Sequence, residues 1–212
     1  MSDQLADSAE RLFAANTGKA VIRAAEDGTF PQVLWDAVTE AGFAAALLPE
    51  HAGGFGATVA EAMSLLRISA AHAAPIPLAE TMLAGWLLAQ AGLLAPEGVL
   101  TLAPVRKNDR LRLHRAADGW RLAGTAGRIP WARDAAAVAV LAEGADGPAL
   151  ALLHAGGFTM EHDRNLAGEP RDTIIVDTLL APDAVAPAPP GLDAARLRAA
   201  GRWRARCRSP AR

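Results

Sequence analysis

Apolar residues recur three or four positions apart through the first part of the chain, which is the spacing of one face of an α-helix. Three such segments are found around Leu12 and Phe13, from Val33 to Ala41, and from Val59 to Ala70. A fourth segment, Leu78 to Ala91, is apolar on most of its sides. Because a helix of that kind must be buried by other elements, the pattern predicts an N-terminal bundle of four helices.

Glycine and proline mark the ends of these segments. Pro31 lies near the start of the second segment, where a missing N–H costs little, and Gly42 follows its end as a C-cap. The next loop is rich in glycine, but no strand precedes it and no Gly-Lys-Ser/Thr follows it, so we interpret it as a helix–helix loop and not as a phosphate cradle. Its notable residues are His51, Gly53, Gly54 and Gly56.

The pattern changes after Pro96 to short runs that alternate or are rich in β-formers. The runs are VLTLAPV, LRLHR, WRLAG, AAVAVLAE, ALALLH, FTMEH and TIIVDTLL. Asp118-Gly119 and Asp146-Gly147 separate neighbouring runs, and Asp-Gly between such runs is a strong hairpin signal. Strands at this spacing predict a small antiparallel β-barrel or sandwich.

Together these patterns predict an α+β multidomain chain. Residues 1–96 form the helical domain, residues 97–186 the middle β domain, and residues 187–212 a linker with the broken-off start of a C-terminal helical domain. Prolines from Pro182 to Pro190 favour an extended linker, and the helical pattern that follows stops near Ala200. The Arg-rich last twelve residues share no periodicity with the rest. A shifted reading frame explains this truncated end better than a phosphate-binding tail.

Charge and composition exclude several classes of function. The 21 Lys and Arg residues balance 23 Asp and Glu residues, so no overall field attracts nucleic acid. The single cysteine, Cys207, cannot form an internal disulfide. The acidic N-terminus is unlike a secretory signal, and the apolar window from Met82 to Ala95 is shorter than the roughly 20 residues of a membrane span. We therefore expect a cytoplasmic protein without membrane or nucleic-acid partners.

Few residues form a recognisable chemical constellation. No Ser-His-Asp, Cys-His or paired-carboxylate arrangement is present, and the histidines are too scattered to bind a metal, so neither catalytic nor metal-binding residues are assigned. Trp35 and Trp86 lie on apolar helix faces and are expected in the core. The most basic part of the body is either a solvated strand surface or a contact for the phosphates of CoA or FAD. It comprises Arg106, Lys107, Arg110, Arg112 and Arg115.

Two stretches resemble the acyl-CoA dehydrogenase family. LWDAVTEAGFAAALLPEHAGGFGAT, residues 34–58, is similar to the signature of its first domain. DGWRLAGTAGRIPWARDAAAVAVLA, residues 118–142, resembles its middle domain around the flavin-facing loop. The resemblance implies FAD and an acyl-CoA substrate. In that family a carboxylate takes the α proton of the thioester while the flavin N5 takes the β hydride.

The resemblance also shows where this chain departs from the family. The family's catalytic glutamate lies in a third, helical domain that this sequence does not contain. The Thr-Glu-Pro…Gly-Ser-Asp element is replaced by residues 102–107, and Trp-Ile-Thr becomes Arg128-Ile129-Pro130. Pro130 offers neither a hydroxyl nor an N–H to a cofactor. The cofactor-binding residues implied, chiefly through their backbone, are Leu102, Ala103, Arg128, Ile129 and Pro130. Trp131, beside them, is the aromatic residue of most interest.

The expected function is therefore that of an FAD-dependent oxidoreductase of fatty-acid metabolism, truncated and inactive alone, in a homo- or hetero-oligomer of acyl-CoA dehydrogenase chains. Two alternatives remain open. The chain is a non-catalytic partner subunit of a heteromeric dehydrogenase, in which the altered loops have a structural role. Otherwise it is an unrelated module that binds CoA or lipid.

Overall fold

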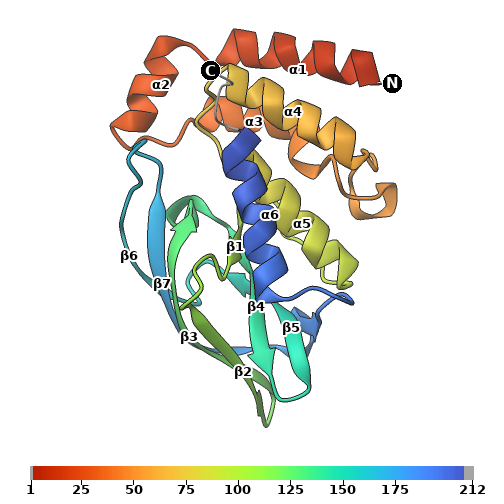
Figure 1. Ribbon diagram of the computed structural model, residues 1–212, viewed down its shortest axis with the longest axis vertical. Helices are drawn as coiled ribbons and strands as arrows, with labels where there is room; N and C mark the ends of the chain where they lie inside the picture. The colour runs from red at the N-terminus through yellow and green to blue at the C-terminus, as the bar shows by residue number, and fades with distance from the viewer. Residues whose placement is uncertain (1, 208–212) are drawn as a thin grey trace.

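A computed structural model describes residues 2–207, with side chains for residues 4–200, and shows a helical layer above a curled β-sheet (Figure 1). The Arg-rich last twelve residues, Cys207 among them, lie outside the described side chains. The helices that precede the sheet are α1 (Ser2–Asn16), α2 (Lys19–Glu26), α3 (Gln32–Glu40), α4 (Val59–Ala71) and α5 (Leu78–Gln90). The four predicted helical segments are thereby confirmed. No helix in the described part of the chain is long and apolar enough to cross a membrane.

Helix α2 was not predicted from the sequence. It contains no fully buried residue, and Val21 packs only partly against the helical core. The helix is only eight residues long, so its apolar positions form a short pattern that was not assigned to a helix from the sequence. In Figure 1, α2 lies at the edge of the helical layer, above the loop between β6 (Thr159–Glu161) and β7 (Arg171–Leu180).

Local signals explain the helix ends. Gly42 follows α3 with φ 73°, a left-handed conformation in which a Cβ is disfavoured. Thr58 begins α4 with a capping box: the Glu61 N–H donates to Thr58 Oγ1 at 3.3 Å, and the Thr58 N–H donates to Glu61 Oε2 at 2.9 Å. Each bond satisfies an N–H that the helix itself leaves without a partner.

Thr58→Ala is expected to lower the free energy of unfolding by about 1 kcal/mol, because it removes the oxygen that caps α4. The Thr58 N–H holds the pKa of Glu61 below its ordinary value. The contribution of Glu61 is therefore complete above the pKa of the unfolded chain and is lost as pH falls through the lower folded value. Urea unfolding of wild type, Thr58→Ala and Glu61→Gln at neutral and acidic pH measures both effects. An unchanged difference between wild type and Glu61→Gln at acidic pH would contradict the second.

The remaining strands are β1 (Leu100–Ala103), β2 (Arg110–Ala116), β3 (Gly119–Pro130), β4 (Ala137–Gly144), β5 (Gly147–His154) and β8 (Val185–Pro187). The sheet order is β6-β7-β3-β2-β4-β5-β8, with β1 paired to β4. Both predicted hairpins are confirmed: Ala116 pairs with Gly119, and Gly144 pairs with Gly147. Pairing is mostly antiparallel. The exceptions are β1 with β4, and one bridge from β2 to β4, which are parallel.

Strands β4 and β5 are buried on both faces. Val138 and Val140 point into the core enclosed by the curled sheet, whereas Ala139 and Leu141 point toward α5. Such strands are continuously apolar because each face packs against a different layer. Helix α5 covers the outer face, and the Thr81 hydroxyl links it to β1 by donating to the Leu100 carbonyl and accepting from the Leu100 N–H.

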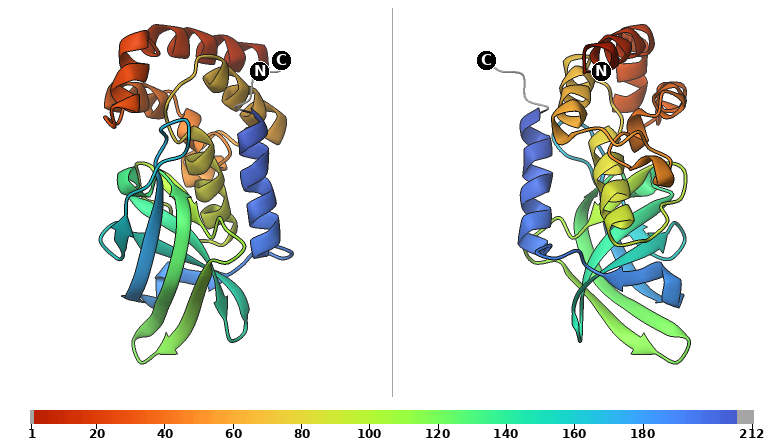
Figure 2. Two further views of the ribbon diagram at one scale, coloured as in Figure 1. Left: turned by 60° about the vertical axis from the view of Figure 1, so that its left-hand side comes forward. Right: turned by 90° about the vertical axis from the view of Figure 1, so that its right-hand side faces the viewer.

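The C-terminal part of the chain differs from the prediction. Helix α6 (Ala194–Cys207), the blue helix in Figure 2, extends past Ala200, where the sequence pattern predicted its end. Its Leu197 packs with residues of α5 and the sheet. The proline-rich segment is also more than a linker, because β8 pairs with β5 at the edge of the sheet. An edge position tolerates proline because one side of the strand needs no N–H donors.

Candidate functional site

The five predicted cofactor-binding residues lie together where β1 and β3 end, but most of their side chains point inward. Ala103 and Ile129 lie in the core enclosed by the sheet, and Leu102 packs toward α5. Pro130 is buried as well. Arg128 is the exception, with 47% of its side chain exposed. The five residues therefore lie together, and Arg128 is the one whose side chain a ligand could reach.

Their backbones are also partly occupied. Leu102 and Ala103 pair with β4, while Ile129 and Pro130 pair with β7. The Pro130 carbonyl additionally accepts a hydrogen bond from Thr101 Oγ1 at 2.6 Å. A flavin ring needs hydrogen-bond partners along its polar edge, and this set provides few. These five residues do not by themselves fit the cofactor.

Two non-glycine residues in the left-handed conformation enclose this segment. Arg128 has φ 59° and Trp131 has φ 56°, and the register of β3 against β7 shifts between Ala126 and Ile129. The shift is a β-bulge, which redirects the strand and turns Arg128 outward. Such conformations cost free energy and persist where the surrounding structure determines them.

Trp131 packs against the helical domain. Its ring packs edge-on against Phe30 at 6.1 Å between centroids, and Phe30 packs against Trp35 at 6.2 Å. Trp131 and Trp35 are both buried, so the expectation of a core Trp35 is confirmed. The same expectation for Trp86 is wrong, because this residue is 38% exposed on the outer face of α5.

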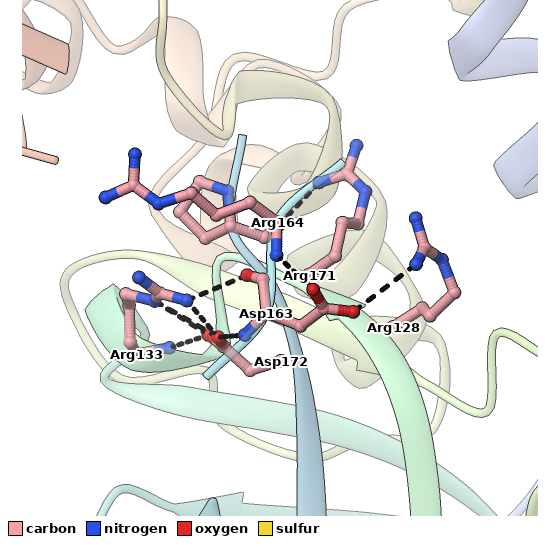
Figure 3. A network of polar contacts seen from close by, with 7 residues as sticks. Arg128, Arg133, Asp163, Arg164, Arg171 and Asp172 are labelled. Carbon is pink, nitrogen blue, oxygen red and sulfur yellow. Dashed lines mark hydrogen bonds and ion pairs between the residues drawn. The ribbon is translucent and has the colours of Figure 1, made fainter. Parts of the chain in front are cut away.

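A buried ion pair supports the bulge from beneath (Figure 3). Asp172 is fully buried and accepts hydrogen bonds from the Arg133 guanidinium, from the Arg133 N–H at 3.0 Å and from the Asp163 N–H at 3.2 Å. Arg133 also donates to the Asp163 carbonyl at 2.8 Å. The Asp163 carboxylate in turn lies 3.4 Å from Arg128. Asp172 therefore holds the loop that contains Asp163, and the Asp163 carboxylate in turn orients Arg128.

The same loop reaches the helical domain. Arg164 Nη1 donates to the Glu26 carbonyl at the end of α2, at 2.8 Å. A cation such as Arg164 at the C-terminus of a helix is electrostatically favourable. The loop from Asp163 to Pro170 therefore joins the two domains.

The buried ion pair also changes the pKa values of the groups around it. The hydrogen bonds from Arg133 to Asp172 raise the pKa of Arg133, and burial raises the pKa of the neighbouring Asp134.

The loop between β1 and β2 is organised by Asp109, whose side chain is 4% exposed. Its carboxylate accepts hydrogen bonds from the backbone N–H groups of Val105, Arg106 and Gly127, at 3.0, 2.6 and 3.0 Å. Three backbone donors compensate the burial of a carboxylate. Asp109 therefore holds this loop against the bulge of β3.

Asp109 and Asp172 were not identified as site residues from the sequence. The ion pair of Asp172 with Arg133 joins residues 39 positions apart. The basic cluster is spread over the sheet: Arg115 stacks over Trp120 at 4.0 Å, while Arg110 donates to the carbonyls of Lys107 and Asp109. Among the described side chains, no group of three or more His, Cys, Asp or Glu residues is placed to hold a metal ion.

The helical part of the chain matches a known protein family, and the whole fold resembles solved structures. Residues 2–94 match the family model described as acyl-CoA dehydrogenase, N-terminal domain. Among solved structures, a variant of the Tcur3481-Tcur3483 steroid ACAD is similar with a TM-score of 0.76 and 26% identity. That match covers 98% of this chain and 60% of the other. No curated protein matches the chain.

Two further structures share the fold. The ChsE4-ChsE5 complex from Mycobacterium tuberculosis has a TM-score of 0.78 at 19% identity, covering 97% of this chain and 59% of that one. Glutaryl-CoA dehydrogenase from Mycobacterium smegmatis has a TM-score of 0.73 at 17% identity, covering 88% and 55%. The chain thus spans about three fifths of the length of these structures, and its fold matches their helical and β parts.

Proposed function

We propose that this chain is a member of the acyl-CoA dehydrogenase family and a subunit of an FAD-dependent oxidoreductase that acts on acyl-CoA thioesters. The family model matches its helical N-terminal domain, and the fold of the helical and β domains together resembles that of a steroid ACAD. The observation that carries the proposal is the match of the fold over 98% of this chain, with a TM-score of 0.76, to a solved structure named as a steroid ACAD. In this proposal the chain supplies the β-side wall of the cofactor site.

The proton-abstracting carboxylate is proposed to come from residues other than those described. Asp172 is neutralised by Arg133, and Asp109 is occupied by three backbone N–H groups. Neither carboxylate is available to approach a substrate carbon, which a general base must do to within hydrogen-bond reach. Bound FAD would accept the hydride. The residues of this chain would shape one side of its pocket and exclude water from that side.

Reconstitution tests this proposal. The full chain alone is expected not to oxidise an acyl-CoA with an artificial electron acceptor. A second family chain is used that carries the C-terminal helical domain and whose own catalytic carboxylate has been replaced. When the full chain is mixed or co-expressed with this second chain, the two are expected to form a complex that binds acyl-CoA and FAD. Turnover by the purified chain alone would overturn the assignment of the base. The absence of any complex with such a chain would overturn the assignment as a subunit.

A non-catalytic partner subunit is the second candidate. It is favoured by the inward side chains at the predicted flavin site and by Pro130, which cannot donate a hydrogen bond. Two of the similar structures are also named as pairs of chains. The position of the flavin separates the candidates: the first proposal predicts FAD bound against this chain in the complex, and the non-catalytic role predicts FAD bound by the partner chain alone. The family match of residues 2–94 leaves no support for an unrelated CoA- or lipid-binding module.

A further inference from the structure

Helix α2 differs from the other helices of the helical layer in how little of it is covered. None of its residues is buried, and it does not pack extensively against any other helix or strand that the structure describes. We propose that α2 is a flap that one side chain, Arg164, latches to the β domain, and that it opens while both domains stay folded. This inference does not depend on the proposed function.

The helix itself contributes little to its own stability. It has eight residues, whereas an isolated helix needs roughly 12 to 15 residues to be even marginally stable in water. No side chain caps its N-terminus, where Gly18 precedes Lys19. Val21 packs only partly against the helical core. The helical state of α2 therefore depends on contacts at its ends.

Arg164 holds the C-terminal end of α2. Its Nη1 donates to the Glu26 carbonyl at 2.8 Å, which is one of the last carbonyls that a helix leaves without a partner. A Cβ on Gly28 would collide with Arg164 Nη2, so the guanidinium lies directly against the backbone that follows the helix. Gly28 has φ 99°, a conformation that favours glycine. The latch thus fits a position where a side chain is missing.

The other end of the latch is anchored in the β domain. The Arg164 N–H donates to Asp163 Oδ1 at 2.7 Å, and Arg164 forms an isolated β-bridge with Pro170. The Asp163 N–H in turn donates to the buried Asp172 carboxylate at 3.2 Å. Arg164 therefore extends toward α2 from a loop that is fixed to the sheet.

The ends of the moving segment are marked by glycine and by an aromatic contact. Gly18 precedes α2 and Gly28 follows it, and glycine readily absorbs the change in backbone angles that a moving segment requires. Beyond Gly28, the Phe30 ring packs against Trp131 of the β domain. The flap therefore comprises residues 18–29.

The contacts that hold the two domains together lie elsewhere. Helix α5 packs on β1 and β4, and the Thr81 hydroxyl bonds to both backbone groups of Leu100. Helix α2 lies at the edge of the helical layer, away from α5 (Figure 1). Release of Arg164 therefore frees the flap and leaves the domains packed against each other. Local opening of this kind requires less free energy than global unfolding.

Proteolysis of the native full chain by trypsin measures this opening. Trypsin cleaves after Lys and Arg, and Lys19 and Arg23 are exposed sites in α2 that are cut only when the helix opens. Arg67 is the matched site, because it is an exposed arginine of α4, a helix with several buried residues. We expect cleavage in α2 to be at least about tenfold faster than cleavage at Arg67. Equal rates at these sites would overturn the flap.

Two variants test the latch. Arg164→Ala is expected to raise the rate of cleavage in α2 about fivefold, with the rate at Arg67 unchanged. Arg128→Ala is the matched control, because Arg128 contacts the same loop through Asp163 and, among the described residues, is not bonded to α2. Each variant also removes one tryptic site of the β domain. An unchanged rate in Arg164→Ala, or an equal rise in Arg128→Ala, would reject Arg164 as the latch.

Hydrogen exchange reports the same opening without a protease. In α2 the Ile22 N–H donates to the Gly18 carbonyl at 3.2 Å, a bond that is broken when the flap opens. Arg164→Ala is expected to speed exchange of the α2 amides about fivefold and to leave those of α4 and α5 unchanged. A uniform increase through α2, α4 and the sheet would mean global destabilisation and would contradict a local flap.

Discussion

Asp172→Asn is expected to lower the free energy of unfolding by about 3 kcal/mol, the lower part of the range for breaking a buried ion pair. Asp172 is fully buried, and the substitution leaves the Arg133 guanidinium facing a neutral amide. The Asp163 N–H also loses a charged acceptor. Because 19% of the Arg133 side chain is exposed, residual hydration moderates the loss.

The matched control lies on the same strand. Asp177 pairs with Arg121 through two bonds of 2.7 Å, but both side chains are more than half exposed, so Asp177→Asn is expected to change stability little. Arg121 lowers the pKa of Asp177, and any contribution of this pair is therefore lost as pH falls through that lowered pKa. Urea unfolding of both variants at neutral pH makes the comparison. Equal effects would contradict the structural role assigned to Asp172.

Ile129→Ala is expected to lower the free energy of unfolding by about 3 kcal/mol, because it leaves a cavity in the core enclosed by the sheet. Ile129 is fully buried and packs with Leu122 and Ile174. If its side chain instead faced a cofactor pocket open to water, the truncation would cost little stability. The substitution therefore distinguishes a packing role from a direct ligand contact.

Arg128→Ala provides the neighbouring comparison. About half of the Arg128 side chain is exposed, and its ionic contact is the exposed 3.4 Å pair with Asp163, so the change in stability is expected to be small. Thermal unfolding of the two variants, measured under identical conditions, gives the answer. A large loss of stability in Arg128→Ala, together with a small loss in Ile129→Ala, would contradict the assignment of Ile129 as the buried side chain and Arg128 as the exposed one.

The order of helices and strands could be predicted from the sequence because it depends on local, periodic signals. Val138 and Val140 alternate with Ala139 and Leu141 between two cores, and Asp118-Gly119 marks a turn that the structure contains. Helix α2 was not predicted because its eight residues give only a short periodic pattern. The strand β8 escaped because its prolines are tolerated only at an edge, which is a property of the sheet and not of the segment.

The site was less predictable because its geometry depends on distant partners. The resemblance located Leu102, Ala103 and Ile129 near one another, but their side-chain directions follow from the register of β1 and the bulge in β3. The partners of Asp172 and Asp109 lie up to 39 and 18 positions away, and no local pattern indicates such contacts. Helix α6 likewise runs beyond Ala200 although its apolar pattern fades.

The FAD content of the chain tests most directly the claim that it forms one wall of a flavin site and depends on another domain for the rest. Equilibrium dialysis against FAD, with bound flavin measured by its visible absorption, is performed on the full chain alone and in complex with a family chain carrying the C-terminal helical domain. We expect substoichiometric flavin in the first case and tightly held flavin in the second. Stoichiometric FAD on the chain alone would contradict the account.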